Sequence, residues 1–326
     1  MLRVDGQIVS QSDLPTLDEP TLRRVLAELT DEAQQAAFTQ ELELDFAYHL
    51  PGEARFRINA ARQRGGISLT LRVIPLEVPH LSNLNLPGIC AQLATRPRGL
   101  VLISGPAASG KSTTLAAMIE YVNRTLARRI VTIEDPIEYI FEDRQSLITQ
   151  REVGEDTHSF AAALKHALRQ DPDLIMVGEM RDLETIAATL TAAETGHLGL
   201  ATLHTPSAPE AVDRIVDVFP AHQQAQIRAQ LAMTLTGVIT QRLALRADQA
   251  GRVPVCEVMV GTPAIANLIR EAKTPQMVSV MQTNREQGMQ TLNQALVERY
   301  RHQTISLDEA LRHTNDPEGL RRQLSA

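Results

Sequence analysis

The chain has 326 residues with 43% hydrophobic and 22% charged side chains, which is typical of a globular protein long enough for two domains. Its 32 Lys and Arg against 39 Asp and Glu give a formal net charge of −7, so it lacks the basic surplus that binds phosphate backbones. Aromatic residues make up only 3%, which removes the stacking platforms of single-strand binders. We therefore expect no nucleic-acid partner.

Cysteine content and apolar patterning indicate the compartment. Cys90 and Cys256 lie far apart in the sequence, without the further cysteines that a metal cage or a disulfide framework needs, so a reducing compartment fits best. The longest apolar stretches are only a few residues long, far short of the ~20 that span a bilayer, and the N-terminus has no secretory signal pattern. We expect a cytoplasmic protein that works against a membrane without entering it.

The first quarter of the chain predicts a small domain with helix and strand. Residues 2–9 read as a hairpin that turns at Asp5-Gly6, and residues 22–29 place apolar side chains on one helical stripe. Residues 54–73 then alternate apolar and polar side chains, which predicts two strands joined at Arg64-Gly65-Gly66. The polar faces of these strands carry arginine, including Arg57 and Arg72.

Three prolines in residues 75–87 predict a linker between domains. After it, apolar strands alternate with helices: strands at 100–104, 130–134, 174–178 and 198–203, and helices from Lys111, around 160–169 and from Leu183. This order predicts a mostly parallel sheet covered on both faces. Beyond Pro220 we expect a mainly helical chain.

A phosphate-binding loop lies between the first of these strands and its helix. Gly105-Pro106-Ala107-Ala108-Ser109-Gly110-Lys111-Ser112 matches G-x-x-x-x-G-K-[ST]. Backbone N–H groups of such a loop cradle phosphates, Lys111 reaches the β and γ oxygens, and the Ser112 hydroxyl binds Mg²⁺. We expect a nucleotide to bind at Gly105–Thr113, with Mg²⁺ held by Ser112 and Glu179, and the loop alone fits a kinase, a GTPase, a helicase or a motor.

Carboxylates and histidines follow the neighbouring strands. Glu179 ends an apolar strand, where an acid can lie beside Mg²⁺ and the attacking water. Glu134 and Glu138 lie at the end of another strand, although the same residues fit a polar loop around Pro136. His197 and His204 flank a third strand and can contact phosphate, or equally serve as structural hydrogen-bonding groups.

These motifs resemble the secretion ATPase superfamily, and within it the PilT-type twitching-motility motors of type IV pili. The resemblance covers nearly the whole chain. Its segments are an Asp box at 132–138, a Walker B motif at 177–182, a His box at 196–205, and Arg214 to Pro220. Residues 261–271, Gly-Thr-Pro-Ala-Ile-Ala-Asn-Leu-Ile-Arg-Glu, are similar to a motif associated with retraction motors.

The resemblance implies an α/β fold: a RecA-like P-loop ATPase domain at 88–326, a linker at 75–87, and a smaller, N-terminally shortened PAS-like α+β domain at 1–74. It implies a homo-hexamer with Arg57, Arg64 and Arg72 as γ-phosphate contacts, a role that suits guanidinium. Glu138 is the preferred residue to activate water, with Glu134 close behind. The implied catalytic set is Glu138, Glu134, Glu179, His204, His197, Arg57, Arg64 and Arg72.

The implied activity is an Mg-dependent ATPase that powers pilus retraction from the inner face of the cytoplasmic membrane. The implied partners are an inner-membrane pilus platform protein and a paralogous retraction ATPase. Two alternatives stay open: an accessory ring component with weak ATPase activity, and an extension or secretion motor. The extension relatives resemble longer proteins with a four-cysteine zinc motif, and two cysteines argue against them.

Three departures from the family pattern accompany the resemblance. A helix and strand that commonly precede the first hairpin are missing, so either the subunit is shortened or its start is misassigned. Ala107-Ala108 replaces the usual Thr-Gly, and an alanine at a positive φ at position 108 costs about 1 kcal/mol or more, which predicts weaker ATP affinity. Ala266 replaces the arginine usual in the retraction motif.

Overall fold

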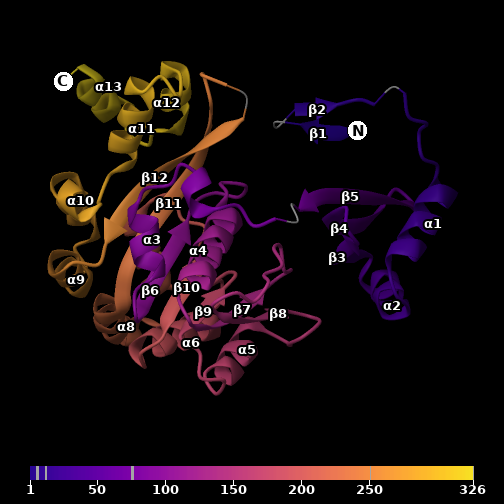
Figure 1. Cartoon of the computed structure of the whole chain (residues 1–326), viewed down its shortest axis with the longest axis horizontal. Coiled ribbons are helices and arrows are strands. Elements are labelled where there is room, and N and C mark those ends of the chain that lie inside the picture. Colours follow the sequence, from indigo (N-terminus) through magenta and orange to yellow (C-terminus); the bar gives the residue numbers. More distant parts are fainter. Residues whose placement is uncertain (5–6, 12, 75–76, 250, 326) are drawn as a thin grey trace. The chain divides into compact units, whose positions relative to one another are not determined.

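The computed structural model describes residues 1–4, 7–11, 13–74, 77–249 and 251–325. The predicted turn at Asp5-Gly6 and the predicted linker's first two residues, Pro75 and Leu76, lie outside these residues. The chain forms two compact units (Figure 1). One comprises Met1–Glu77 and Glu138–Ile140, and the other comprises Val78–Ile137 and Phe141–Ala326.

The smaller unit contains helices and antiparallel strands. Its elements are β1 (Leu2–Val4), β2 (Gln7–Val9), α1 (Glu19–Leu29), α2 (Glu32–Glu41), β3 (Glu43–Leu50), β4 (Ala54–Gln63) and β5 (Gly66–Ile74). Strands β1 and β2 pair antiparallel, and β3, β4 and β5 form an antiparallel sheet. The predicted hairpin pairing, the helix and the strands β4 and β5 are confirmed, whereas β3 was not predicted.

Helix α1 is fixed to the sheet of the smaller unit through its first residues. Asp18 caps the helix by accepting from Thr21 N at 3.0 Å, and Glu19 Oε2 accepts from Ile67 N on β5 at 3.0 Å. The apolar stripe of α1 faces the sheet, where Leu26 packs in a core with Ile58 and Ile67. The core therefore lies between the helices and one face of the three strands.

The larger unit is built on a seven-stranded sheet in the order β12-β11-β6-β10-β9-β7-β8. The strands are β6 (Gly99–Ser104), β7 (Arg129–Glu134), β8 (Leu147–Glu152), β9 (Leu174–Val177), β10 (Leu198–Thr202), β11 (Leu235–Leu245) and β12 (Arg252–Val260). All neighbours are parallel except β11 and β12, so the predicted mostly parallel sheet is confirmed.

The expectation of a mainly helical chain beyond Pro220 is wrong in one stretch. Strands β11 and β12 add an antiparallel pair to the sheet, with β11 hydrogen-bonded to β6. Strand β12 is rich in Val, and β11 contains the β-branched run Val238-Ile239-Thr240; both compositions favour a strand over a helix. Strand β8 was likewise not predicted.

Helices cover both faces of this sheet (Figure 1). They are α3 (Ile89–Ala94), α4 (Lys111–Thr125), α5 (Phe160–Ala167), α6 (Leu183–Glu194), α7 (Ala208–Asp217), α8 (Ala221–Thr234), α9 (Pro263–Arg270), α10 (Met277–Thr283), α11 (Leu292–Arg301), α12 (Leu307–His313) and α13 (Pro317–Ser325). Short 3₁₀ turns occur at Leu81–Asn83, Thr274–Gln276 and Arg285–Gln287.

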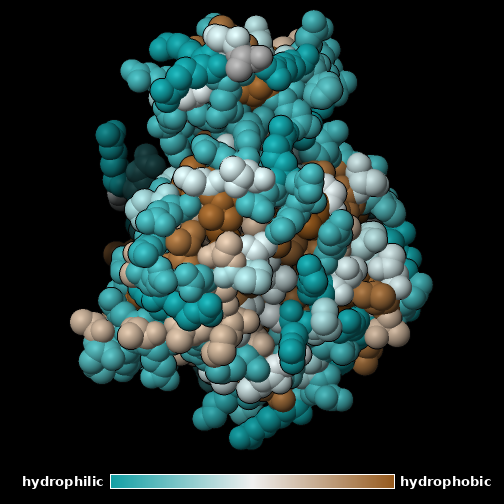
Figure 2. Space-filling view, turned by 90° about the vertical axis from the view of Figure 1, so that its left-hand side faces the viewer, coloured by the Kyte–Doolittle hydropathy of each residue, from teal (hydrophilic) through white to brown (hydrophobic). Residues whose placement is uncertain are grey.

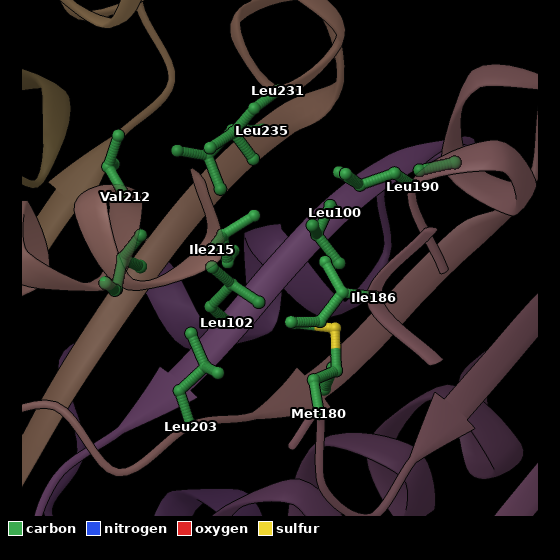
Figure 3. Packing of buried hydrophobic residues seen from close by; sticks show 14 of the residues in the cluster. Leu100, Leu102, Met180, Ile186, Leu190, Leu203, Val212, Ile215, Leu231 and Leu235 are labelled. Carbon is green, nitrogen blue, oxygen red and sulfur yellow. The ribbon is translucent and has the colours of Figure 1, made fainter. Parts of the chain in front are cut away.

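Strand alternation divides the core of the larger unit into two layers. Leu100 and Leu102 of β6 pack with α6, α7 and α8 on one face (Figure 3), whereas Val101 and Ile103 pack with α3 and α4 on the other. A third cluster joins the far ends of β11 and β12 to α11, α12 and α13. No helix among the described residues is both long and apolar enough to cross a membrane.

Candidate active site

The phosphate loop has the backbone shape of an anion cradle. It connects β6 to α4, and Gly105, Ala108 and Gly110 have φ angles of 131°, 60° and 87°. Gly110 caps α4, which begins at Lys111, so the unpaired N–H groups at the start of the helix belong to the loop. Ala108 does adopt the positive φ that makes alanine costly there.

The loop rests on Gln241 of β11, a residue that the sequence analysis did not single out. Gln241 Nε2 donates to Ser109 O at 2.7 Å, and Gln241 Oε1 accepts from Thr114 Oγ1 at 2.7 Å. A Cβ at Gly105 would lie 2.2 Å from Gln241 O, so glycine is required where the loop passes this strand. The available signal was a polar pair, Gln241-Arg242, inside an apolar strand pattern.

Lys111 lies in the loop with its ammonium group held by backbone oxygens. Lys111 Nζ donates to Gly105 O and to Pro106 O, each at 2.9 Å, and the residue is 8% exposed. Lys111 Nζ also lies 3.3 Å from His204 Nδ1. The positive charge is thus fixed where the loop would receive phosphate.

His204 connects Lys111 to Glu179. His204 Nε2 lies 3.1 Å from Glu179 Oε1, while its other ring nitrogen faces Lys111. A neutral ring with the proton on Nε2 satisfies both contacts, because it donates to the carboxylate and accepts from the ammonium group. The structure therefore brings three predicted site residues from three different strand ends into one hydrogen-bonded chain.

Glu179 is also paired with Arg181, at 2.5 Å between Oε1 and Nε. Partial burial by itself would raise the pKa of Glu179, but the hydrogen bond from Arg181 and the interaction with His204 outweigh it and lower the pKa below its usual value. The carboxylate is therefore ionised at neutral pH. A charged carboxylate in this position suits a role beside a cation.

Glu134 is the last residue of β7, and its side chain is fixed by neighbours. Glu134 Oε1 accepts from Thr132 Oγ1 at 2.7 Å and from Gln150 Nε2 at 3.1 Å, and the residue is 7% exposed. Gly178 N donates to Ile133 O at 2.8 Å, which places the chain just before Glu179 beside Glu134. Glu138 belongs to the short segment Glu138–Ile140 of the smaller unit and is half-buried.

The structure does not bring His197 to the phosphate loop of the same chain. His197 precedes β10, whereas His204 follows it, so the two lie at opposite ends of one strand. His197 Nδ1 lies 3.0 Å from Ala192 O, at the end of α6, and 3.2 Å from Thr195 Oγ1. These contacts match the alternative of a structural hydrogen-bonding group, and they do not support the catalytic interpretation of His197.

The three predicted arginines lie on the smaller unit. Arg57 of β4 and Arg72 of β5 are direct cross-strand partners, which confirms their placement on the polar strand faces. Arg64 lies in the turn between these strands with a φ of 47°. Because Arg57 and Arg72 lie opposite each other on one face of the sheet, they place two positive charges there, which suits binding of an anion.

The donor groups of the larger unit fit Mg²⁺ bound together with a nucleotide. Ser112 lies in the first turn of α4, and its hydroxyl and the Glu179 carboxylate are the oxygen donors that Mg²⁺ prefers. The described residues contain no group of three or more His, Cys, Asp or Glu able to hold a metal by themselves.

Comparisons with known proteins agree with this geometry. Residues 46–250 match the family model described as type II/IV secretion system protein. The chain is 47% identical over 318 residues to the type IV pilus retraction ATPase PilT of Pseudomonas aeruginosa, covering 98% of this chain and 92% of that protein. It is 42% identical over 320 residues to the type IV pilus ATPase PilU of the same organism, covering 98% and 84%.

A solved structure shares the fold. The crystal structure of the pilus retraction motor PilT with bound ADP superimposes with a TM-score of 0.89 at 45% sequence identity. The match covers 98% of this chain and 91% of the other. The α/β architecture with a large, mostly parallel sheet is therefore shared along nearly the whole chain.

Proposed function

The chain belongs to the type II/IV secretion system protein family, and we propose that it is an ATPase that powers the retraction of type IV pili. One observation carries the proposal: Lys111 of the phosphate loop, His204 and Glu179 form one connected site. This site lies in a chain 47% identical to a retraction ATPase along 98% of its length.

ATP binds at Gly105–Thr113, where the loop N–H groups receive the β and γ phosphates and Lys111 neutralises their charge. Ser112 and Glu179 would hold Mg²⁺, which supplies further charge neutralisation at the phosphates. His204 holds the side chains of Lys111 and Glu179 in fixed positions relative to each other through its two ring nitrogens. Glu138 or Glu134 orients the water that attacks the γ phosphate in line.

The fixed carboxylate of Glu134 suits a residue that positions water, since its hydrogen bonds with Thr132 and Gln150 leave it little freedom to rotate. Glu138 remains the family-based choice. Arg57, Arg64 and Arg72 contact the γ phosphate and stabilise its developing charge. In this proposal residues 1–74 form the PAS-like domain, 75–87 the linker and 88–326 the ATPase domain.

The active form is a homo-hexamer at the inner face of the cytoplasmic membrane, where it acts on a pilus platform protein and works with a paralogous retraction ATPase. Helix α9, from the retraction motif, offers a surface for such a partner. Ile265 and Ile269 anchor it in the core, while Asn267 and Arg270 are exposed. Figure 2 shows patches of hydrophobic surface among hydrophilic residues on the side where Figure 1 labels α9 and α10.

Ala266, which replaces the usual arginine of this motif, is half-buried against the core. The substitution therefore alters a packing position of α9 and leaves its exposed polar residues in place. This supports the retraction assignment.

An accessory ring component with weak ATPase activity is the second candidate. The positive φ of Ala108 favours it, because strain in the phosphate loop opposes the shape that binds ATP. The chain's identity to PilT is higher than its identity to PilU, which favours the motor.

Steady-state ATP hydrolysis by the purified chain separates these two functions. We expect saturable turnover in the presence of Mg²⁺ and a loss of about 100-fold or more in Lys111→Ala, because the γ-phosphate charge loses its fixed cation. Arg96→Ala is a matched control, since this exposed cation lies before β6 at the opposite edge of the sheet. Undetectable turnover in the wild type would favour the accessory role, and equal turnover in Lys111→Ala would overturn the site.

A further inference from the structure

Two adjacent residues of β11 reach opposite faces of the central sheet. Successive side chains of a strand alternate between faces, so Gln241 faces α4 and the phosphate loop while Arg242 faces the layer of α7. Neither residue belongs to the motifs of the proposed site. Both are nevertheless hydrogen-bonded to segments that carry it.

Gln241 supports the phosphate loop through two hydrogen bonds of its side-chain amide. Its amide bonds to Ser109 O and Thr114 Oγ1 span the end of the loop and the first turn of α4, and the residue is 2% exposed. Both hydrogen-bonding ends of the side chain are used, so the amide is fixed in one orientation. A shift of β11 at this residue would therefore move the loop.

Arg242 holds two segments on the other face. Its Nη2 donates to Pro206 O at 3.4 Å and to Asn315 Oδ1 at 2.7 Å, and its Nη1 donates to His313 O. Pro206 follows the His box, whose Thr205 N donates to Ser104 Oγ at 3.0 Å directly before the phosphate loop. The guanidinium group thus joins the His-box segment to the junction between α12 and α13.

A second contact attaches α12 to the end of β11. Glu309 is 7% exposed, and its Oε1 accepts from Leu245 N at 2.7 Å and lies 3.0 Å from His313 Nε2. A buried carboxylate with several donors gives a rigid attachment. The C-terminal helices are therefore attached to β11 at Arg242, directly after the residue that supports the loop, and at Leu245, near the end of the strand.

We propose that β11 couples the C-terminal helices to nucleotide binding, with Gln241 as a positioning residue for the phosphate loop and Arg242 as the link to the junction of α12 and α13. The inference rests on the proposed function, since it needs ATP to bind at the loop. A contact of a neighbouring subunit or a partner with α12 or α13 would then change ATP affinity. The coupling is reciprocal, so bound ATP would also reposition these helices.

The experiment is a double-mutant cycle on nucleotide affinity, measured as the Kd of a fluorescent ATP analogue and as the KM and kcat for ATP. Gln241→Glu is nearly isosteric but replaces the donor to Ser109 O by an oxygen, and we expect KM to rise about tenfold with kcat changing less.

Asn315→Ala removes an exposed partner of Arg242, and we expect KM to increase about two- to threefold. If the two residues are coupled, the double variant shows less than the product of the single effects.

Thr240→Val is the matched control on the same strand. Thr240 is 2% exposed and its hydroxyl has no hydrogen-bond partner among the described residues, so the isosteric change should leave KM and Kd unaltered. Thr114→Val provides a second route to the Gln241 contact if Gln241→Glu does not fold, and it should shift KM in the same direction. Melting temperatures verify folding in every variant.

Two results would overturn the inference while leaving the proposed function intact: wild-type KM in folded Gln241→Glu or Thr114→Val, or single effects that multiply in the double variant. Failure of the wild type to bind the ATP analogue would instead contradict the proposed function. If Asn315→Ala keeps the wild-type Kd but loses turnover, that result would also count against the coupling, because the proposed coupling changes ATP affinity.

Discussion

The carboxyl ends and the amino ends of the strands form two edges of the seven-stranded sheet, and similar residues at these two edges make different contacts. At the carboxyl edge, where β6, β9 and β10 end, His204 lies between Lys111 and Glu179. At the amino edge of the same sheet, His197 hydrogen-bonds the end of α6, and Glu194 accepts from Gln230 at 2.7 Å. Strand direction, more than residue type, therefore decides which charged groups meet.

The largest difference in ATP turnover between the two edges should appear when one carboxylate at each edge is replaced by an amide. Glu179→Gln removes the charge beside the predicted cation site, and we expect ATP turnover to fall by about 100-fold or more. Glu194→Gln, at the amino edge, should leave turnover unchanged. Turnover rates of the two purified variants test this contrast, and similar rates would remove Glu179 from the site.

The pH dependence of Glu179 follows from its lowered pKa. Its usual value is 4.5, so its contacts with Arg181 and His204 stabilise the fold above that pH and are lost as the pH falls through the lowered pKa. Melting temperatures of the wild type and Glu179→Gln should therefore differ at pH 7 and converge in acid. A difference that grows as the pH falls would contradict this assignment.

A smaller effect is expected from the two histidines of the His box. His204→Asn separates Lys111 from Glu179, and we expect turnover to fall by about 10- to 100-fold, as for other residues that orient a site. His197→Asn should change turnover by less than about twofold, because it alters only the hydrogen bonds at the end of α6. A larger loss in His197→Asn would reverse the comparison and place the amino edge in the mechanism, for example through a neighbouring subunit.

The smallest expected effect concerns the loop backbone. Ala108 has a φ of 60°, so Ala108→Gly should raise the free energy of unfolding by about 1 kcal/mol and lower the Kd for ATP several-fold. Ala107→Gly is the matched control, because Ala107 has no positive φ to relieve. An unchanged Kd in Ala108→Gly would refute the weakened affinity predicted from the sequence.

Much of the larger unit could be predicted because its signals are local. The phosphate loop has a fixed spacing, and the apolar runs before it and before Glu134 and Glu179 are short buried strands. Strands β3, β8, β11 and β12 were missed, although residues 44, 46, 48 and 50 are apolar at a period of two. Strand β3 pairs with the neighbouring β4, and β12 pairs with the neighbouring β11. Only the pairing of β11 with β6 joins distant parts of the chain, and periodicity does not report such a pairing.

The site was predicted less completely than the fold for the same reason. The position of Glu179 and His204 at one edge follows from parallel strands, but the contact of Gln241 with Ser109 joins residues 132 positions apart. The polar pair Gln241-Arg242 in the apolar pattern of β11 indicates a polar role for these residues but does not identify Ser109 as the partner. His197 is the opposite case: it is close in sequence to His204, which suggested that both belong to the site. Strand β10 lies between them, so the two histidines are at opposite ends of that strand.

The most direct test of the central claim is the retraction of labelled pili in cells that lack this protein, recorded by fluorescence microscopy. Expression of the wild-type chain should restore retraction, whereas Lys111→Ala, produced at the same level, should leave pili extended. Restored retraction with Lys111→Ala, or extended pili with the wild type, would contradict the proposal that ATP hydrolysis at this loop powers retraction.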